Sequence, residues 1–368
     1  MKFNLIREQL LKPLQLVVGV IEKRQTMPIL ANVYLELKNN QLSLTGTDLE
    51  IEMVVRIPLD GDFEEGEITV PAKKLADICR SLPEESDIKF ELSDNRLLVK
   101  SGRSRFQLST LPASDYPVTE QGEHDTLFTV TKAGVKRLID RTGFAMAQQD
   151  VRYYLNGMLW EVTPTRFRAV STDGHRLALC DLTSVEIPVE DRKLAIVPRK
   201  GIMELSRLLD DNEEPVEIAL GPTHIQLRTD VFTFTSKLID GKFPEYERVL
   251  PQGGDKVLFG AKADLKQAFA RASILSNEKY RGVRLILSDG LLTIVANNPE
   301  QEEATEEVLV DYNGGDMEIG FNVSYLQDVT NVIDSDSIKI TLSNPNASAL
   351  IEEPNGGDSL YVVMPMRM

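Results

Sequence analysis

Cysteine and histidine are scarce in this chain, which holds 2 cysteines and 3 histidines among 368 residues. Cys79 and Cys180 form no CxxC pair and no disulfide framework, so we expect two buried small side chains in a reducing cytoplasm. His124, His175 and His224 are scattered and are too few for a histidine-rich metal centre. The sequence therefore predicts neither a metal site nor a cofactor.

Long apolar runs and nucleotide-binding motifs are missing as well. No apolar run approaches the roughly 20 residues of a membrane span. The segment MKFNLIREQLLKPLQ places Arg7, Glu8 and Lys12 inside its hydrophobic pattern, unlike a signal peptide. We therefore expect a cytoplasmic protein that does not bind a membrane. The sequence also lacks a P-loop, so the chain is not expected to use ATP by itself.

The stretch STDGH holds Ser171, Asp173 and His175, which are the three residue types of a hydrolytic triad. They alternate along one short segment, without a G-x-S-x-G turn or a context for an oxyanion hole. We therefore expect a protein that is not an enzyme and has no catalytic residues.

The chain repeats a pattern at a period of about 125 residues. TVPAKKLADICRSLP begins at Thr69, IVPRKGIMELSRLLD at Ile196 and IGFNVSYLQDVTNVID at Ile319. Each reads as a short strand followed by a helix with apolar residues at helical spacing. Two further features recur at the same period. One is a strand that is followed by a polar turn, and the other is the strand and helix with which each repeat begins. Three patterns with one spacing indicate a triplication.

Each repeat reads β-α-β-β-β-α-β-β-β, with alternating strands such as QLSLTG and RLLVKSG joined by polar turns. Helices packed on antiparallel sheets belong to the α+β class. We predict three repeated domains at residues 1–124, 125–253 and 254–368. The six expected helices span roughly residues 6–13, 72–81, 132–142, 198–210, 262–272 and 322–334.

The net charge of −16 argues against a nucleic-acid partner only if it is spread evenly, because phosphates attract basic surfaces. The six expected helices carry +7 together, which leaves −23 for the rest of the chain. One interpretation is that basic helices face an anionic polymer and grip phosphates without reading bases. The alternatives are ordinary solvated helix faces and a repeat scaffold that binds only proteins, which the basic helices disfavour.

Long strings of this sequence resemble the bacterial sliding clamps, the beta subunits of DNA polymerase III. They run through the whole chain and include LSLTGTDLE, QDVRYYLNGM, STDGHRLA, ILSNEKYRGVRL, ANNPEQEEA and MPMR. The resemblance implies a DNA-clamp fold and a head-to-tail homodimer whose six domains close into a ring around double-stranded DNA. It also implies a processivity factor in DNA replication. The implied partners are the polymerase catalytic subunit, the clamp loader, and other polymerases and repair proteins, which bind through a peptide groove.

Two surfaces are expected to meet in that dimer. The first holds Lys74, Arg103, Arg105, Phe106 and Leu108, and the second holds Ile274, Leu275, Glu300, Glu302 and Glu303. By resemblance, Phe106 and Leu108 pack against Ile274 and Leu275, framed by ion pairs. Judged from the residues alone, Ile274 and Leu275 also fit a helix core, and the acidic run fits a solvated strand.

The resemblance assigns five residues to DNA, namely Arg24, Lys73, Gln149, Tyr153 and Tyr154. Lysine and arginine meet phosphates, and Gln and Tyr hydrogen-bond to backbone oxygens or stack weakly. Because neighbouring residues of a strand face opposite ways, one of the two tyrosines equally fits a core position.

The peptide groove implied by the resemblance draws on three segments. Its residues are Thr172, Gly174, His175, Arg176 and Leu177, then Pro244, Arg248 and Val249, then Ser348, Val362, Met364, Pro365, Met366, Arg367 and Met368. Flexible Met side chains suit a site that accepts varied peptides, and Arg176 and Arg367 are candidates to bind a polar or acidic group. Met368 stands where the family is expected to have Leu, a nearly volume-conserving change. Without the resemblance, the apolar tail fits a buried final strand.

Overall fold

The computed structural model describes residues 1–21, 27–117, 124–183 and 185–367. The expected repeat is present three times, each time as β-α-β-β-β-β-α-β-β-β. The sequence interpretation placed three strands between the two helices of a repeat, and that number was one too low. The fourth strand, such as β5 (Gly66–Pro71), runs into its helix without a loop.

The helices of the described residues confirm the six expected segments. Their bounds are α1 Arg7–Val20, α2 Ala72–Ser81, α3 Lys132–Thr142, α4 Arg199–Leu208, α5 Lys262–Ile274 and α6 Val323–Val332. Only α1 departs clearly from its expected range, because it continues through Pro13 to Val20. Leu10, Leu14 and Val17 are buried on one of its faces. The free energy gained by burying that face outweighs the cost of the backbone hydrogen bond that Pro13 cannot donate.

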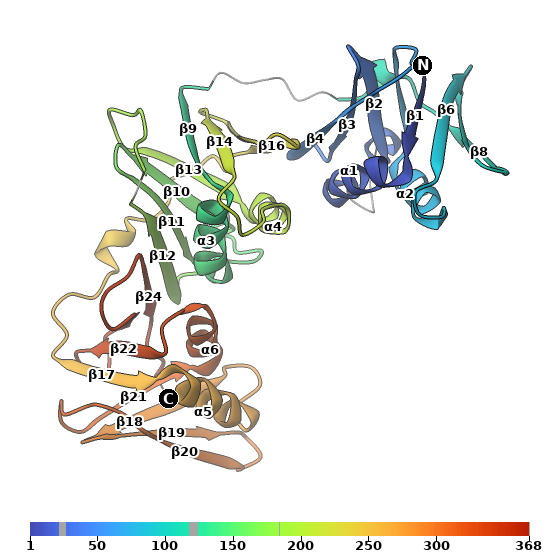
Figure 1. Ribbon diagram of the computed structural model, residues 1–368. Helices are drawn as coiled ribbons and strands as arrows, with labels where there is room; N and C mark the ends of the chain where they lie inside the picture. The colour runs from blue at the N-terminus through green and yellow to red at the C-terminus, as the bar shows by residue number, and fades with distance from the viewer. Residues whose placement is uncertain (22–26, 118–123, 184, 368) are drawn as a thin grey trace. The chain divides into compact units, whose positions relative to one another are not determined.

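The first of two compact units holds residues 1–132 and 207–238. Its eight-stranded sheet has the order β5-β2-β3-β4-β16-β15-β14-β9, and its four-stranded sheet has the order β1-β6-β7-β8. Helices α1 and α2 contact each other, and α1 packs on β3 and β4 (Figure 1). The strands are β1 Lys2–Ile6, β2 Asn32–Lys38, β3 Gln41–Thr47, β4 Ile51–Pro58, β5 Gly66–Pro71, β6 Asp87–Ser93, β7 Arg96–Ser101, β8 Ser104–Ser109, β9 Thr126–Thr131, β14 Pro215–Leu220, β15 His224–Arg228 and β16 Phe232–Lys237.

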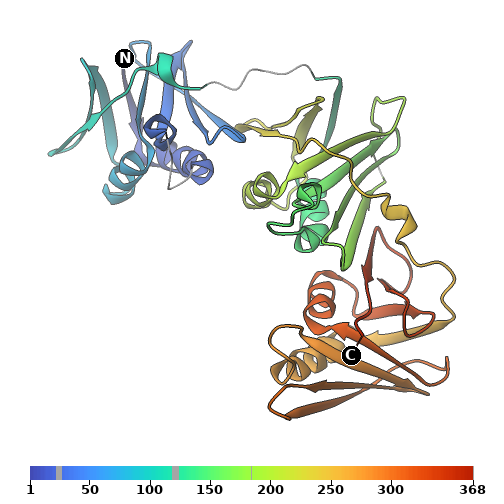
Figure 2. The ribbon, with the colours of Figure 1, turned by 180° about the vertical axis from the view of Figure 1, so that it is seen from behind.

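The second unit holds residues 133–206 and 239–368. Its eight-stranded sheet has the order β13-β10-β11-β12-β24-β23-β22-β17, and its four-stranded sheet has the order β20-β19-β18-β21. Helices α5 and α6 contact each other, and α5 packs on β19 and β20 (Figure 2). The strands are β10 Gly157–Thr163, β11 Arg166–Thr172, β12 Arg176–Leu182, β13 Lys193–Pro198, β17 Lys256–Ala261, β18 Gly282–Ser288, β19 Leu291–Asn297, β20 Glu303–Leu309, β21 Met317–Asn322, β22 Ser337–Leu342, β23 Ala349–Glu352 and β24 Ser359–Val363.

Both eight-stranded sheets join strands from two different repeats. In the first, β4 pairs with β16 and places Met53 opposite Phe234. In the second, β12 pairs with β24 and places Leu177 opposite Val362. All strand pairs are antiparallel, which with the packed helices confirms the α+β class. The compact units cut across the repeats, and the domain bounds near residues 124 and 253 stay a prediction.

Both cysteines are buried free thiols, as expected for small hydrophobic side chains. Burial raises the pKa of Cys79 and that of Cys180 to about 11. Within the described residues, no group of three or more His, Cys, Asp and Glu side chains is placed to hold a metal ion. The same part of the chain contains no helix long and apolar enough to cross a membrane.

Candidate functional site

The STDGH segment forms the tight turn between β11 and β12. Gly174 has a φ of +86°, a backbone conformation that glycine adopts without strain. The Asp173 carboxylate accepts backbone N–H bonds from His175 at 2.9 Å and from Arg176 at 3.0 Å. The Thr172 hydroxyl accepts from the Gly174 N–H at 3.1 Å and donates to the Arg176 carbonyl at 2.6 Å. The turn is therefore fixed by its own side chains.

The C-terminal strand lies directly beside this turn. In the pairing of β12 with β24, Arg176 is opposite Val363 and Leu177 is opposite Val362. The Met364 N–H then donates to the His175 carbonyl at 2.9 Å. Two segments of the expected groove, far apart in sequence, are thus brought together. The tail is a final strand, as its apolar residues alone suggested, and its role as a groove wall stays a prediction.

The third expected segment is anchored through Tyr246. Tyr246 is 1% exposed and belongs to one apolar cluster with Leu177 and Val362. It begins the short helix Tyr246–Arg248, and its carbonyl accepts the Val249 N–H at 2.9 Å. Pro244 and Arg248 are exposed on either side of it. The fold therefore holds this segment against the strands that carry the other groove residues.

A buried polar network fixes Tyr246. Its hydroxyl donates to Glu161 at 2.7 Å and accepts from Arg168 at 3.1 Å. Burial acts to raise the pKa of Glu161, but hydrogen bonds from Tyr246 and Arg192 outweigh it and hold that pKa below its ordinary value. Burial raises the pKa of Tyr246 to about 12. The network joins the segment after residue 243 to the sheet of β10–β12.

Replacing Tyr246 by Phe is expected to lower the free energy of unfolding by about 1–3 kcal/mol, because a buried bond to a charged group is lost. Urea denaturation followed by circular dichroism measures the change. Tyr280→Phe is the matched control, since Tyr280 is 56% exposed. Equal stability of the Tyr246 variant and the unaltered protein would contradict the anchoring role.

The remaining groove residues surround the end of β24. Ser348 directly precedes β23, in which Ala349 is opposite Val363. Met364, Pro365 and Met366 are half-buried, Arg367 is exposed, and Met368 lies outside the described residues. These side chains form a partly apolar surface at the end of β24, which lies between β12 and β23 in the sheet.

The side chain of Arg176, unlike that of Arg367, is bound by other residues of the protein. It forms ion pairs with Asp173 and Asp328, donates to the Phe144 carbonyl at 2.8 Å and stacks over the Tyr325 ring at 4.5 Å. A guanidinium with these partners has little left for a ligand, so Arg367 is the better candidate of the two. Tyr325 and Asp328 lie on α6, and nothing near them in the sequence pointed to this site.

The residues expected to meet DNA differ in exposure. Lys73 is exposed on α2, and Gln149 is exposed with a φ of +54°. Tyr153 is 56% exposed, whereas Tyr154 packs on the cluster that contains Val362. The pair lies in the short helix Tyr153–Leu155 and not in a strand, so the assumption of strand alternation was wrong. Arg24 lies outside the described residues.

The loop that carries Gln149 is tied to the STDGH turn. Arg152 pairs with Asp150 at 2.9 Å and donates to the Asp173 carbonyl at 3.1 Å. Hydrogen bonds from Arg152 lower the pKa of Asp150 to about 2. The loop with the candidate DNA contacts and the turn with the candidate groove contacts are thus linked through one side chain.

Most of the residues expected at the dimer interface lie on or beside the edge strands of the two four-stranded sheets, whereas Lys74 lies on α2. β8 ends one four-stranded sheet and carries Arg105, Phe106 and Leu108, and β20 ends the other and begins at Glu303. Exposed residues of the two sets are Lys74, Arg103, Arg105, Ile274, Glu300, Glu302 and Glu303. Phe106 and Leu275 are half-buried, and Leu108 is 6% exposed.

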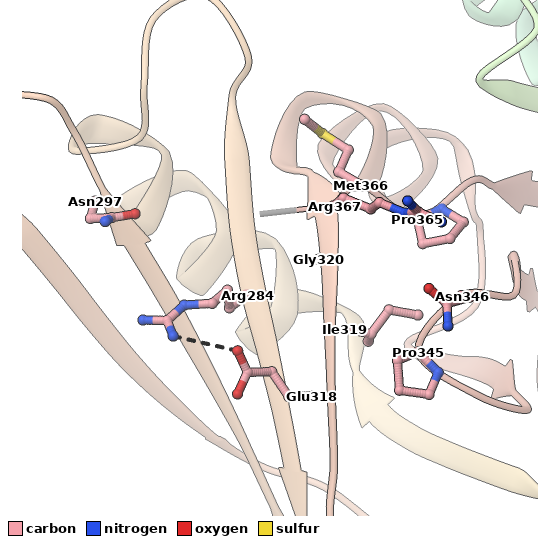
Figure 3. A pocket seen from close by; sticks show the side chains of 10 residues that line it. All are labelled: Arg284, Asn297, Glu318, Ile319, Gly320, Pro345, Asn346, Pro365, Met366 and Arg367. Atoms are coloured by element: carbon pink, nitrogen blue, oxygen red, sulfur yellow. Dashed lines mark hydrogen bonds and ion pairs between the residues drawn. The ribbon is translucent and has the colours of Figure 1, made fainter.

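Pro365, Met366 and Arg367 also line a hollow of about 830 Å³ (Figure 3). Its remaining lining residues are Arg284, Asn297, Glu318, Ile319, Gly320, Pro345 and Asn346. The sequence interpretation missed all seven. They come from β18, β19, β21 and the turn after β22, and no local pattern sets them apart.

Comparison with known families covers the chain in three parts. The family models described as the N-terminal, central and C-terminal domains of the DNA polymerase III beta subunit match residues 1–120, 129–245 and 247–367. These ranges follow the three repeats.

Individual proteins match along the full chain. The beta sliding clamp of Pseudomonas aeruginosa is 60% identical over 368 residues, and that of Escherichia coli K12 is 52% identical over 369 residues, each covered completely. A crystal structure of the Pseudomonas aeruginosa sliding clamp with ligand has a TM-score of 0.98 at 60% identity. A Bartonella birtlesii sliding clamp bound to griselimycin has a TM-score of 0.95 at 37% identity. Both structures are covered completely.

Proposed function

Because this chain belongs to the DNA polymerase III beta subunit family, the bacterial sliding clamps, we propose that it tethers its partners to duplex DNA through a peptide groove at the end of β24. Membership of the family makes it a processivity factor of DNA replication that works as a ring-shaped dimer. The proposal adds which residues contact DNA, which contact the second protomer and which bind the peptide. It also names the polymerase catalytic subunit, the clamp loader and repair proteins as partners.

One observation carries the groove assignment. The pairing of β12 with β24 brings Leu177 opposite Val362 and joins the STDGHRL and YVVMPMRM segments. Tyr246 supports it, because that ring packs the segment with Pro244 and Val249 on the same cluster. A concave surface with Met side chains and few polar groups suits short peptides of varied sequence.

The proposed dimer joins β8 of one protomer to the region of α5 and β20 of its partner. Both strands are sheet edges, and an unpaired edge is a template for another strand. Arg103 and Arg105 bring positive charge to one edge, while Glu300 and Glu303 bring negative charge to the other. The two edges differ, so the contact is head-to-tail, and a two-protomer ring satisfies both edges of each chain.

DNA contact is proposed for exposed Lys73, Gln149 and Tyr153, together with Arg24. Basic side chains on helices hold phosphates without reading sequence, and such contacts weaken as salt rises. Enclosure by a ring does not weaken in that way. Sliding and retention thus have separate physical origins, namely exchangeable contacts and a closed topology.

We propose no catalytic role for the Ser171, Asp173 and His175 segment. The Asp173 carboxylate accepts the N–H groups of His175 and Arg176 and pairs with the Arg176 side chain. Its role in the turn is therefore structural. Opening of the ring is assigned to a separate clamp loader that uses ATP.

Negative-stain electron microscopy of the purified protein tests the assembly. The expected particle is a ring of six similar lobes with a central hole wide enough for a DNA duplex. A compact or elongated solid particle would overturn the proposed enclosure of DNA.

A further inference from the structure

The hollow of Figure 3 has a polar floor made by three neighbouring strands. Arg284 lies on β18, Asn297 ends β19 and Glu318 lies on β21. Val283 and Phe321, on the same strands, are buried in the core cluster. Alternation along a strand therefore turns the polar side chains to the face opposite the core. The walls are the turn Pro345–Asn346 and the segment Pro365–Arg367.

Arg284 reaches this hollow with spare hydrogen-bond donors. Within the described part of the chain, its side chain has one polar contact, from Nη1 to Oε1 of Glu318 at 3.4 Å. Arg271 of the same repeat instead binds Glu306 through two bonds of 2.9 and 2.6 Å. Because a guanidinium carries five N–H donors, the single long contact leaves most of the Arg284 donors available.

Arg367 brings a second cation to the hollow. It is exposed, and among the side chains that Figure 3 draws as sticks only those of Arg284 and Glu318 are joined by a dashed line. The described residues that line the hollow therefore carry one more cation than anion, on a protein whose net charge is −16. A locally positive hollow on an acidic protein favours an anionic ligand.

We propose that this hollow extends the peptide groove and binds an acidic residue that flanks the segment held in the groove. The inference rests on the proposed function, because Pro365, Met366 and Arg367 line both the groove and the hollow. A carboxylate fits the available donors of Arg284 or Arg367, since guanidinium and carboxylate match in geometry. Glu318 disfavours a phosphate dianion at the same place. Acidic residues beside the groove-binding segment thus select among partners.

The test uses three fluorescent peptides and the full-length protein. Each peptide carries the clamp-binding segment of the polymerase catalytic subunit from the same organism, with neutral flanks or with two Glu residues added at one end or the other. Anisotropy titration gives the Kd of each peptide. The readout is the ratio of the Kd for the neutral peptide to that for an acidic peptide, which cancels contacts inside the groove.

Arg284→Gln is expected to lower this ratio about threefold for one of the two acidic peptides, as for a partly exposed charge pair. Glu318→Gln is expected to raise the ratio. Arg228→Gln is the matched control, because Arg228 contacts Glu217 on a neighbouring strand at the same 3.4 Å. It should leave the ratio unchanged, and higher salt should shrink the difference between the Arg284 variant and the unaltered protein.

The outcomes separate this inference from the function on which it rests. Equal ratios in the unaltered protein and in Arg284→Gln, with all peptides bound, overturn the acidic subsite and leave the groove in place. Failure of every peptide to bind rejects the groove and the subsite together. If Arg228→Gln lowers the Kd ratio as much as Arg284→Gln does, the effect is due to the overall charge of the protein, and the subsite is also overturned.

Discussion

A chain that carries Ile274→Ala together with Leu275→Ala is expected to be a monomer. Ile274 is 74% exposed at the end of α5, and Leu275 is half-buried, so neither side chain is simply helix core. An exposed Ile beside a free sheet edge is a natural contact for the proposed partner residue Phe106. Burial of each such side chain contributes about 1.5–3 kcal/mol, so the double variant should raise the dimer Kd by roughly 100-fold or more.

Light scattering across a range of protein concentrations measures this change. Leu194→Ala with Val231→Ala is the matched control, because it removes side chains that are 55% and 49% exposed away from both proposed edges. The control should remain a dimer. If the Ile274 and Leu275 variant stays dimeric at the lowest concentration measured, the assignment of this surface is wrong.

Removal of Met364–Met368 is expected to abolish peptide binding and to leave the dimer intact. The deletion takes away the Met364 N–H bond to the His175 carbonyl and the Met366 N–H bond to the Gly320 carbonyl, 2.9 and 2.8 Å long. It also removes the Met side chains of the proposed groove. Strand β24 ends at Val363, so its pairing with β12 survives. The peptide Kd should rise at least about 100-fold, or roughly 2.8 kcal/mol.

Calorimetric titration with the polymerase peptide measures this loss, and light scattering on the same sample checks the dimer. Met368→Leu serves as the conservative control, since the two side chains have similar volume and the peptide should still bind. A truncated protein with unchanged peptide affinity would refute the assignment of the tail to the groove.

Local sequence patterns determined much of the architecture. Apolar residues at helical spacing located six helices, and α1 alone ran clearly beyond its expected range, because its buried face continues past Pro13. The three-fold recurrence also predicted the repeats. These features depend on short-range spacing, which any one segment carries within itself.

Tertiary structure decided which of the predicted residues are available to a partner. Arg176 and Arg367 look equivalent in sequence, yet Arg176 is bound by Asp328 and Tyr325 from the next repeat, whereas Arg367 is exposed. Tyr153 and Tyr154 are neighbours, and a short helix leaves only the first of them exposed. No pattern along the chain encodes such differences, because the contacting residues lie in distant segments.

The sequence by itself determined the repeats, the helices and the family to which the chain belongs. Only the tertiary structure decided that β24 pairs with β12 and that a hollow forms between the tail and β21. The physical reason is that each repeat forms its own strands locally, while the choice of partner for a strand edge depends on which edges remain free after folding. That choice places the end of the chain beside the STDGH turn.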